Sequence, residues 1–315
     1  MKKIFIISGI VLLFITVFVS GSLIYINSAY PVSSPPENIK ISPTSEMLNR
    51  GEYLAKHVAY CIYCHSQRDI NKFACPLVEG TEGKGGERFG DDEGYPGYIY
   101  AKNITPASIG GWSDGELIRA VTCGVTKDNF PIFPVMNYAG FNTLSKSDLY
   151  SIVAFIRTLK PIKNDVPFSK INFPTNIFIK MLPLRNSSPV EEIDTSNIIE
   201  YGKYLANIAS CKYCHSPFSK GRTIKGKEFI GTRPFIVNGK TIYSPNITPD
   251  NRTGIGNLSA EKFIRLFKKY DAASIKNNSD CLNCIMPWVM FSGMTETDLK
   301  SIYSYLKTLP AIYAE

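Results

Sequence analysis

Two five-residue stretches hold the residue types best placed to do chemistry: residues 61–65 read Cys-Ile-Tyr-Cys-His, and residues 211–215 read Cys-Lys-Tyr-Cys-His. Cysteines three positions apart lie on one helical turn, so both thiols can add to the vinyl groups of a single porphyrin. The histidine that follows is then carried beneath the ring, where its imidazole can bind the iron. We interpret the stretches as attachment sites for two covalently bound haem c groups. The predicted attachment cysteines and iron-binding histidines are Cys61, Cys64 and His65 in the first stretch, and Cys211, Cys214 and His215 in the second.

A single Cys-x-x-Cys-His stretch has other interpretations, because a cysteine pair can also be a thioredoxin-like redox centre or half of a zinc site. The repetition argues against both. Each stretch follows a similar predicted helix, and each is followed by a serine, Ser66 or Ser216. A duplicated haem-binding unit explains this pattern best.

The beginning of the chain predicts a membrane anchor. Lys2 and Lys3 precede residues 4–26, which are almost continuously apolar and would form a helix about 34 Å long, enough to cross a hydrocarbon core of about 30 Å. The apolar region of a secretory signal is shorter, about 7–15 residues. Because residues 20–22 (Ser-Gly-Ser) offer a cleavage site, removal as a signal is the alternative. We expect residues 1–30 to be a retained transmembrane helix (or an uncleaved signal), with the soluble domains on the periplasmic side of a bacterial inner membrane.

The net charge of +8 is concentrated in the second half of the chain. Residues 50–160 hold 12 basic and 12 acidic residues, whereas residues 199–315 hold 16 basic and 9 acidic ones. This asymmetry favours an acidic partner protein for the second half, and a solvated basic face explains it equally well. Nucleic acid is a poor explanation for the charge of an exported haem protein.

Residues 31–43 are rich in Pro and Ser, and we interpret them as an extended tether. The rest of the chain contains an internal repeat. Residues 44–160 and 195–315 match element by element, and we expect each to form one mostly α-helical domain. The features that they share are an opening helix with a glycine (Gly51, Gly202), an Asn-Ile-Thr-Pro turn (103–106, 246–249), a helix beginning at Ser113 or Ser259, and a closing helix capped by Ser145 or Thr295. Apolar residues recur at helical spacing along both closing helices, so we expect each to cross its opening helix at the glycine.

Residues 161–194 join the two units and carry five prolines. Residues 171–173 and 177–179 are too apolar for a flexible linker in water. We therefore interpret the segment as a strap that lies over the domains and fixes their relative orientation. A second, shallow contact with the membrane is the alternative.

Methionine is the predicted ligand on the other side of each iron. The chain has three histidines, and the third, His57, lies on the opening helix, where we expect a surface position or a contact with a haem propionate. Met136 and Met286 each stand 75 positions after the first cysteine of their unit. A thioether is a soft, neutral ligand that closes the iron to substrate. Met290 is the rival ligand in the second unit.

Four cysteines stand outside the two stretches. Cys281 and Cys284 have no histidine after them, so we expect a short-range disulfide between them in an oxidising compartment. Cys75 and Cys123 fall in the same unit and could form a second bridge. The alternatives are a zinc site built from all four cysteines, and haem ligation by Cys75 or Cys123.

These motifs resemble those of diheme c-type cytochromes, specifically the cytochrome c subunits of membrane-bound alcohol and gluconate dehydrogenases. The resemblance rests on the Cys-x-x-Cys-His stretches, on the Asn-Ile-Thr-Pro turn followed by Ile-Gly-Gly-Trp-Ser, and on Met-Pro-Trp with Met-Thr-Glu-Thr-Asp-Leu in the second unit. It covers nearly all of residues 44–310 and implies two tandem class I cytochrome c domains with histidine and methionine on each iron. In two respects the sequence departs from that family: its dehydrogenase-linked subunits usually carry three haems, and Leu258 stands where the first unit has Trp112.

The expected function is electron transfer rather than catalysis. A haem closed by histidine and methionine changes oxidation state with little rearrangement, so the chain would carry electrons from a dehydrogenase or quinol-oxidising donor to a terminal oxidase or other acceptor. A diheme cytochrome c peroxidase is the alternative, and it would need one haem with an open distal side beside an acid or base. A haem-bearing subunit of an oxidase complex is the third interpretation.

Overall fold

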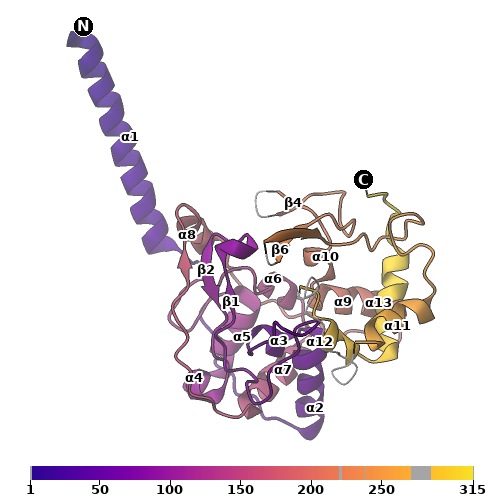
Figure 1. Cartoon of the computed structure of the whole chain (residues 1–315). Coiled ribbons are helices and arrows are strands. Elements are labelled where there is room, and N and C mark those ends of the chain that lie inside the picture. Colours follow the sequence, from indigo (N-terminus) through magenta and orange to yellow (C-terminus); the bar gives the residue numbers. More distant parts are fainter. Residues whose placement is uncertain (1, 220–221, 238, 271–284, 315) are drawn as a thin grey trace.

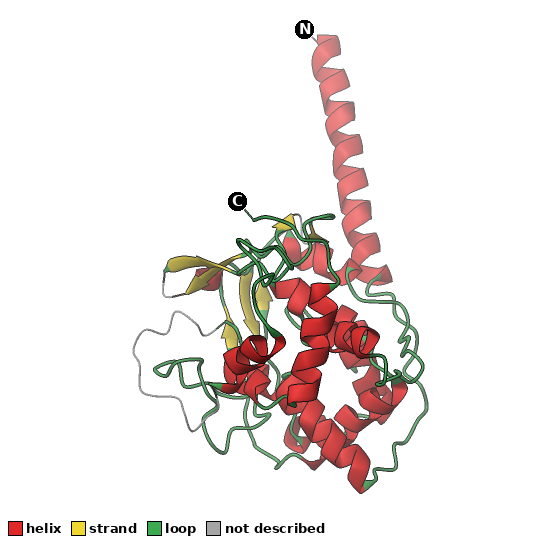
Figure 2. Ribbon diagram, turned by 90° about the vertical axis from the view of Figure 1, so that its right-hand side faces the viewer, coloured by secondary structure: helices red, strands yellow, loops and turns green. Residues whose placement is uncertain are grey.

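The computed structural model describes residues 2–219, 222–237, 239–270 and 285–314. Figure 1 shows one long helix, α1 (Lys2–Ala29), that stands clear of a body built mainly of short helices. Figure 2 shows the same arrangement from the side. None of the residues of α1 is buried, and its length and composition suffice to cross a membrane. The predictions of a mostly helical chain and of an N-terminal apolar helix are therefore confirmed.

The first unit begins with an opening helix and ends with a closing helix. Its elements are α2 (Ser45–Tyr53), the π-helical η1 (Leu54–Val58), α3 (Cys61–Cys64), β1 (Arg88–Phe89), the 3-10 helix η2 (Asp91–Glu93), β2 (Gly97–Tyr100), α4 (Pro106–Ile109), α5 (Asp114–Cys123), α6 (Tyr138–Phe141) and α7 (Lys146–Thr158). The segment that follows adds β3 (Lys170–Ile171), α8 (Thr175–Phe178) and the 3-10 helix η3 (Ile179–Met181). β1, β2 and β3 form one antiparallel sheet, in which Phe89 pairs with Ile99 and Gly97 pairs with Ile171.

The second unit repeats the order of the helices. Its elements are α9 (Ile198–Ile208), α10 (Cys211–Cys214), β4 (Phe218–Ser219), β5 (Arg222–Thr223), β6 (Pro234–Val237), β7 (Lys240–Tyr243), α11 (Ala260–Lys268), α12 (Trp288–Ser292) and α13 (Glu296–Lys307). β4 pairs with β5 and β6 pairs with β7, both antiparallel.

In each unit the closing helix crosses the opening helix at a glycine. A Cβ atom on Gly51 would stand 1.9 Å from the carbonyl oxygen of Ser151 on α7, and a Cβ on Gly202 would stand 1.9 Å from that of Ser301 on α13. No larger residue fits at either position without moving a helix backbone. The predicted crossing is confirmed in both units.

The closing helices begin and pack as predicted. The hydroxyl of Ser145 accepts a hydrogen bond from the backbone N–H of Asp148, and the hydroxyl of Thr295 accepts one from that of Asp298. The apolar stripes lie in the core, with the most deeply buried positions at Leu149, Ile152, Val153, Leu299, Ile302 and Leu306. Burial of these stripes against the opening helices holds each unit together.

The two opening helices differ by one residue. Gly51 precedes the first cysteine of its unit by ten positions, whereas Gly202 precedes Cys211 by nine. The π-helical η1 takes up the extra residue, because a π turn accommodates one residue more than an α turn. As a result, both opening helices reach the Cys-x-x-Cys-His stretch in the same way, through one residue in the left-handed conformation (Tyr60 at φ 41° and Ser210 at φ 59°).

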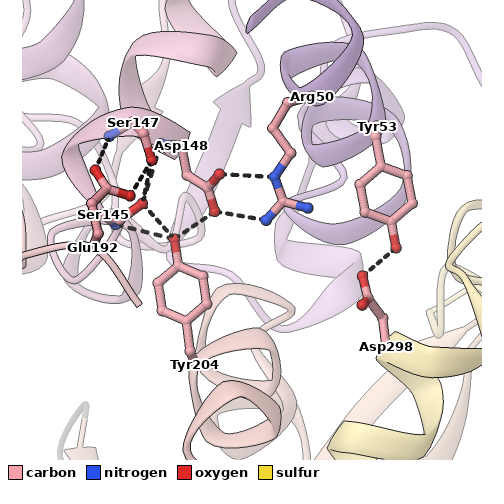
Figure 3. Close-up of polar contacts among 8 residues, drawn as sticks. All are labelled: Arg50, Tyr53, Ser145, Ser147, Asp148, Glu192, Tyr204 and Asp298. Carbon is pink, nitrogen blue, oxygen red and sulfur yellow. Dashed lines mark hydrogen bonds and ion pairs between the residues drawn. The ribbon is translucent and has the colours of Figure 1, made fainter. Parts of the chain in front are cut away.

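Two equivalent tyrosines join the units (Figure 3). The hydroxyl of Tyr204 donates to a carboxylate oxygen of Asp148 (2.8 Å) and accepts from the backbone N–H of Ser145 (3.0 Å). In the opposite direction, the hydroxyl of Tyr53 donates to Asp298 (2.5 Å). It also accepts from the N–H of Thr295 (3.1 Å). We call these contacts the tyrosine–aspartate pairs. Because each opening helix binds the first turn of the other unit's closing helix, the two units face each other with approximate twofold symmetry.

The segment 161–194 is hydrogen-bonded to the first unit. β3 extends the sheet of that unit, the N–H of Leu184 donates to the carbonyl oxygen of Cys123 (2.9 Å), and Ser147 donates to the carboxylate of Glu192 (2.6 Å). That the segment fixes the orientation of the two units stays a prediction.

We expect Gly202→Ala to lower the free energy of unfolding by about 1–3 kcal/mol, because the added methyl group would force α13 away from α9. Denaturant unfolding followed by circular dichroism measures the loss. Gly111→Ala is the matched control, since its Cβ would meet no atom within 4 Å, and it should change stability by less than about 0.5 kcal/mol. Equal losses in the two variants would contradict the close crossing.

We expect Tyr204→Phe to destabilise the chain by about 1–3 kcal/mol, because it leaves the buried N–H of Ser145 without its acceptor. Tyr53→Phe should have a similar effect at the other pair. Thermal unfolding compares both with Tyr243→Phe, a change in a ring that is 66% exposed. If Tyr204→Phe and Tyr243→Phe were equally stable, the pairs would not hold the units together.

Candidate haem sites

The two Cys-x-x-Cys-His stretches form matching short helices, α3 and α10. Each starts after the left-handed residue that ends the opening helix, and its two cysteines stand on one turn. All four of these cysteines are free thiols. The stretches therefore have the geometry that attachment of one porphyrin to both thiols requires.

Both histidines are oriented by a backbone carbonyl group. Nδ1 of His65 lies 2.6 Å from the carbonyl oxygen of Lys102, and Nδ1 of His215 lies 2.9 Å from that of Pro245. Since Nδ1–H donates to the carbonyl oxygen, Nε2 carries the free lone pair, which is the usual second-shell arrangement of a metal-binding histidine. Burial lowers the pKa of both imidazoles, so the neutral, ligating form is favoured.

The Asn-Ile-Thr-Pro turns hold these carbonyl groups in place. The side chain of Asn103 donates to the carbonyl oxygen of Ile162 (2.8 Å), just beyond the closing helix, and accepts from the N–H of Thr105 (2.9 Å). In the second unit Asn246 donates to Ile312 (2.7 Å) and accepts from Thr248 (2.8 Å). The sequence showed this motif as a repeat, and the structure adds its position: it begins at the residue after the histidine's acceptor.

The serine that follows each histidine makes an equivalent hydrogen bond in the two units. The buried hydroxyl of Ser66 accepts from the N–H of Gly83, and that of Ser216 accepts from the N–H of Phe229, each at 3.0 Å. These bonds fix the loop that returns beneath the histidine. The repeated serine is therefore a structural residue of the site.

Met136 and Met286 occupy equivalent turns. The carbonyl oxygen of Met136 accepts from the N–H of Tyr138, and that of Met286 accepts from the N–H of Trp288, both at 2.7 Å. Both side chains are half-buried and pack against the core. Met290, the rival in the second unit, is only 5% exposed. Ligation by Met136 and Met286 stays a prediction.

Two buried donors have no hydrogen-bond partner in the described part of the chain near these motifs: Nε1 of Trp288 and Nε of Arg68. Trp288 follows Met286 by two positions, and Arg68 follows His65 by three. Unpaired buried N–H groups are costly unless an acceptor completes them. Free thiols, an available Nε2 and donors that lack an acceptor all fit haem c, whose propionates supply acceptor oxygens.

The thiols do not fit the thioredoxin-like or zinc interpretations. Burial raises the pKa of Cys61 and of Cys211 to about 12 and that of Cys64 to about 11, so the thiolate form is disfavoured at neutral pH. Reactive cysteine pairs have lowered pKa values instead. Within the described ranges, no three His, Cys, Asp or Glu residues form a group that could hold a metal ion.

The two candidate sites lie close together where the units meet. The side chain of Asn137, next to Met136, donates to the hydroxyl of Ser210 at the start of α10 (2.8 Å). Conversely, Tyr60 at the start of α3 packs edge-on against Phe291 of α12, with ring centroids 5.6 Å apart. Each Cys-x-x-Cys-His helix thus begins beside the other unit's methionine turn. Burial at this contact raises the pKa of Tyr60.

The proposed bridge between Cys75 and Cys123 is wrong. Cys123 is a buried free thiol at the end of α5, whereas Cys75 is disulfide-bonded. The prediction rested on the two cysteines falling in the same unit. A disulfide also needs a short Cα–Cα separation and Cβ atoms that point toward each other, and the sequence does not show these. The expected Cys281–Cys284 bridge lies outside the described residues.

His57 does not lie at the open surface. Its Nδ1–H donates to the carbonyl oxygen of Met290 (2.9 Å) in the second unit, and its ring is half-buried between the units. Burial is the largest cause of its lowered pKa, and the nearby Lys56 and Lys268 also lower it, whereas the bond to Met290 and the charge of Glu52 raise it. His57 is therefore an interface residue.

No family model matches the chain. Among curated proteins the chain is similar to c-type cytochromes. It is 25% identical over 282 residues (84% of this chain, 55% of the relative) to the cytochrome c subunit of the quinone-dependent alcohol dehydrogenase of Gluconobacter oxydans. It is 26% identical over 287 residues (84% and 60%) to the gluconate 2-dehydrogenase cytochrome c subunit of Pantoea cypripedii.

A third relative matches the chain along almost its whole length: the diheme cytochrome c-type protein of Cereibacter sphaeroides, 28% identical over 292 residues (90% of this chain, 92% of the relative). By contrast, the chain spans a little more than half the length of the two dehydrogenase subunits. These relatives confirm the resemblance that the motifs indicated. They are c-type cytochromes rather than catalytic subunits, and they imply haem c as the cofactor.

We expect the stability of the chain to fall with acidification in part through His57. Because its pKa in the folded state is lowered from 6.5, the unfolded state binds the proton more readily. The contribution of His57 is therefore present above pH 6.5 and is lost as the pH falls through the lowered pKa.

Denaturant unfolding of wild type and of His57→Gln, from about pH 8 to about pH 5, tests this effect. The variant should lose less stability across that range, because it lacks the group that is protonated on unfolding. Parallel profiles in the two proteins would contradict the interface position of the neutral imidazole.

Proposed function

We propose that this chain is a membrane-tethered cytochrome c that carries electrons through two covalently bound haems. The observation that supports this most strongly is the duplicated histidine geometry: two buried imidazoles, each following a pair of free thiols and each donating Nδ1–H to an equivalent carbonyl group. When bound, each haem supplies one-electron chemistry by alternating between its ferric and ferrous states.

Three kinds of residue would hold each haem: two attachment cysteines, one histidine and one methionine. Cys61, Cys64, Cys211 and Cys214 would attach the porphyrins, and His65 and His215 would give Nε2 to the irons. Met136 and Met286 would close the opposite faces with thioether sulfur, which raises the reduction potential relative to a second histidine. Closed irons favour electron transfer over peroxide chemistry, and the one spare imidazole, His57, is bonded at the interface rather than free as an acid or base.

The placement of the sites supports transfer between the haems within one chain. Both Cys-x-x-Cys-His helices begin at the contact between the units, and the tyrosine–aspartate pairs hold that contact. An electron that enters at one unit would thus reach the other without a diffusional encounter.

The relatives suggest the donor, and α1 suggests the location. Because the similar proteins are cytochrome subunits of alcohol and gluconate dehydrogenases, we infer a dehydrogenase or quinol-oxidising donor and a terminal oxidase or other acceptor. Retention of α1 would tether the chain to a bacterial inner membrane, with both units on the periplasmic side.

We expect Met136→Ala and Met286→Ala each to abolish about half of the weak far-red absorption of the ferric protein, because each removes the thioether sulfur from one iron. Visible spectra of the purified full-length variants, normalised to haem content, measure the loss. Met290→Ala is the control for the second unit and should keep the full band. A full band in Met286→Ala together with its loss in Met290→Ala would reassign the ligand.

A further inference from the structure

The residues that follow β3 expose apolar side chains on one short segment. We call residues 173–182, which include α8 and η3, the exit segment. The exposed fractions of its large apolar side chains are 75% for Phe173, 54% for Phe178, 39% for Met181 and 49% for Leu182. Large apolar groups gathered on so few residues indicate a surface that another apolar phase covers.

The exit segment is joined to the body by backbone hydrogen bonds and by one buried side chain, so its exposed side chains do not belong to a frayed loop. Before it, β3 pairs with β2, and the N–H of Asn172 donates to the carbonyl oxygen of Pro96 (2.8 Å). Within it, Ile179 is only 3% exposed. The segment therefore buries Ile179 while the four large apolar side chains named above stay exposed.

The exit segment lies beside the C-terminal end of α1 (Figure 1). The ammonium group of Lys180 donates to the side-chain oxygen of Asn27 in the last turn of α1. At the same end, Tyr25 and Tyr30 pack edge-on with ring centroids 6.3 Å apart. Tyrosine and lysine at the end of an apolar helix mark the level of the lipid headgroups.

The sequence on both sides of the exit segment is basic, as a contact with an anionic membrane surface requires. Residues 166–190 contain Lys170, Lys180 and Arg185 and no acidic residue. Basic residues beside exposed aromatic and aliphatic side chains are the composition of an interfacial membrane contact.

We propose that the exit segment lies in the headgroup region of the bilayer that α1 spans and forms a second, shallow membrane contact. This inference rests on the proposed retention of α1. A single helix leaves a protein free to swivel, whereas a second contact beside it fixes the tilt. The membrane contact would thereby set which face of the two units meets a membrane-bound redox partner.

Site-specific photocrosslinking in native membranes tests the proposal on the full chain. The photoreactive residue p-benzoylphenylalanine replaces Phe178, and mass spectrometry of the irradiated protein measures phospholipid adducts. The same residue at Ile70 is the matched control. Ile70 is 66% exposed, and its loop packs toward the end of α11 through the stacked rings of Phe73 and Tyr270, across the molecule from α1 (Figure 1).

We expect a several-fold higher yield of phospholipid adduct at Phe178 than at Ile70. A third variant carries the label at Ile15, within α1, and reports on the anchor itself. Adducts at Ile15 without any excess at Phe178, or a crosslink from Phe178 to another protein, would overturn the membrane contact while leaving the anchor intact. No adduct at Ile15 would refute both the anchor and the contact, and the visible spectrum of the same sample reports haem attachment independently.

Discussion

The close crossing of opening and closing helices is the constraint on which the rest of the molecule depends. A glycine in each opening helix allows the backbones to touch, and this places the first turn of the closing helix beside the other unit. There, the carboxylates of Asp148 and Asp298 accept hydrogen bonds from the hydroxyl groups of Tyr204 and Tyr53, respectively. Asp148 also binds the guanidinium group of Arg50 through two hydrogen bonds, at 2.8 and 2.9 Å. One local contact thus determines both how each unit packs and how the two units meet.

The packing of the opening and closing helices also determines the geometry of the candidate sites. The opening helix delivers the Cys-x-x-Cys-His stretch, and the chain just beyond the closing helix binds the asparagine of the Asn-Ile-Thr-Pro turn. That turn places the carbonyl group that orients the histidine. Helix packing is therefore coupled to the direction of Nε2 on each histidine. A disturbance at Gly51 or Gly202 should reach the candidate haem site through these few bonds.

Local sequence patterns predicted much of this arrangement. Helix caps, apolar stripes and repeated motifs depend on neighbours in the chain. The capping roles of Ser145 and Thr295 and the buried stripes of α7 and α13 could therefore be predicted from the sequence. Contacts between distant segments could not. The tyrosine–aspartate pairs, the burial of His57 and the state of Cys75 depend on which surfaces meet, and one sequence does not record this. The π turn at η1 could have been found, because the distances from Gly51 and Gly202 to the following cysteines differ by one.

The proposal that each chain holds two closed irons is tested most directly by electron paramagnetic resonance. The spectrum of the fully oxidised, full-length protein at low temperature distinguishes low-spin from high-spin ferric haem, and spin integration against chain concentration gives the number of each. We expect two low-spin ferric haems per chain and no high-spin signal, because histidine and methionine would hold both irons six-coordinate. A single haem per chain, or a high-spin signal that changes when peroxide is added, would contradict a two-haem electron carrier.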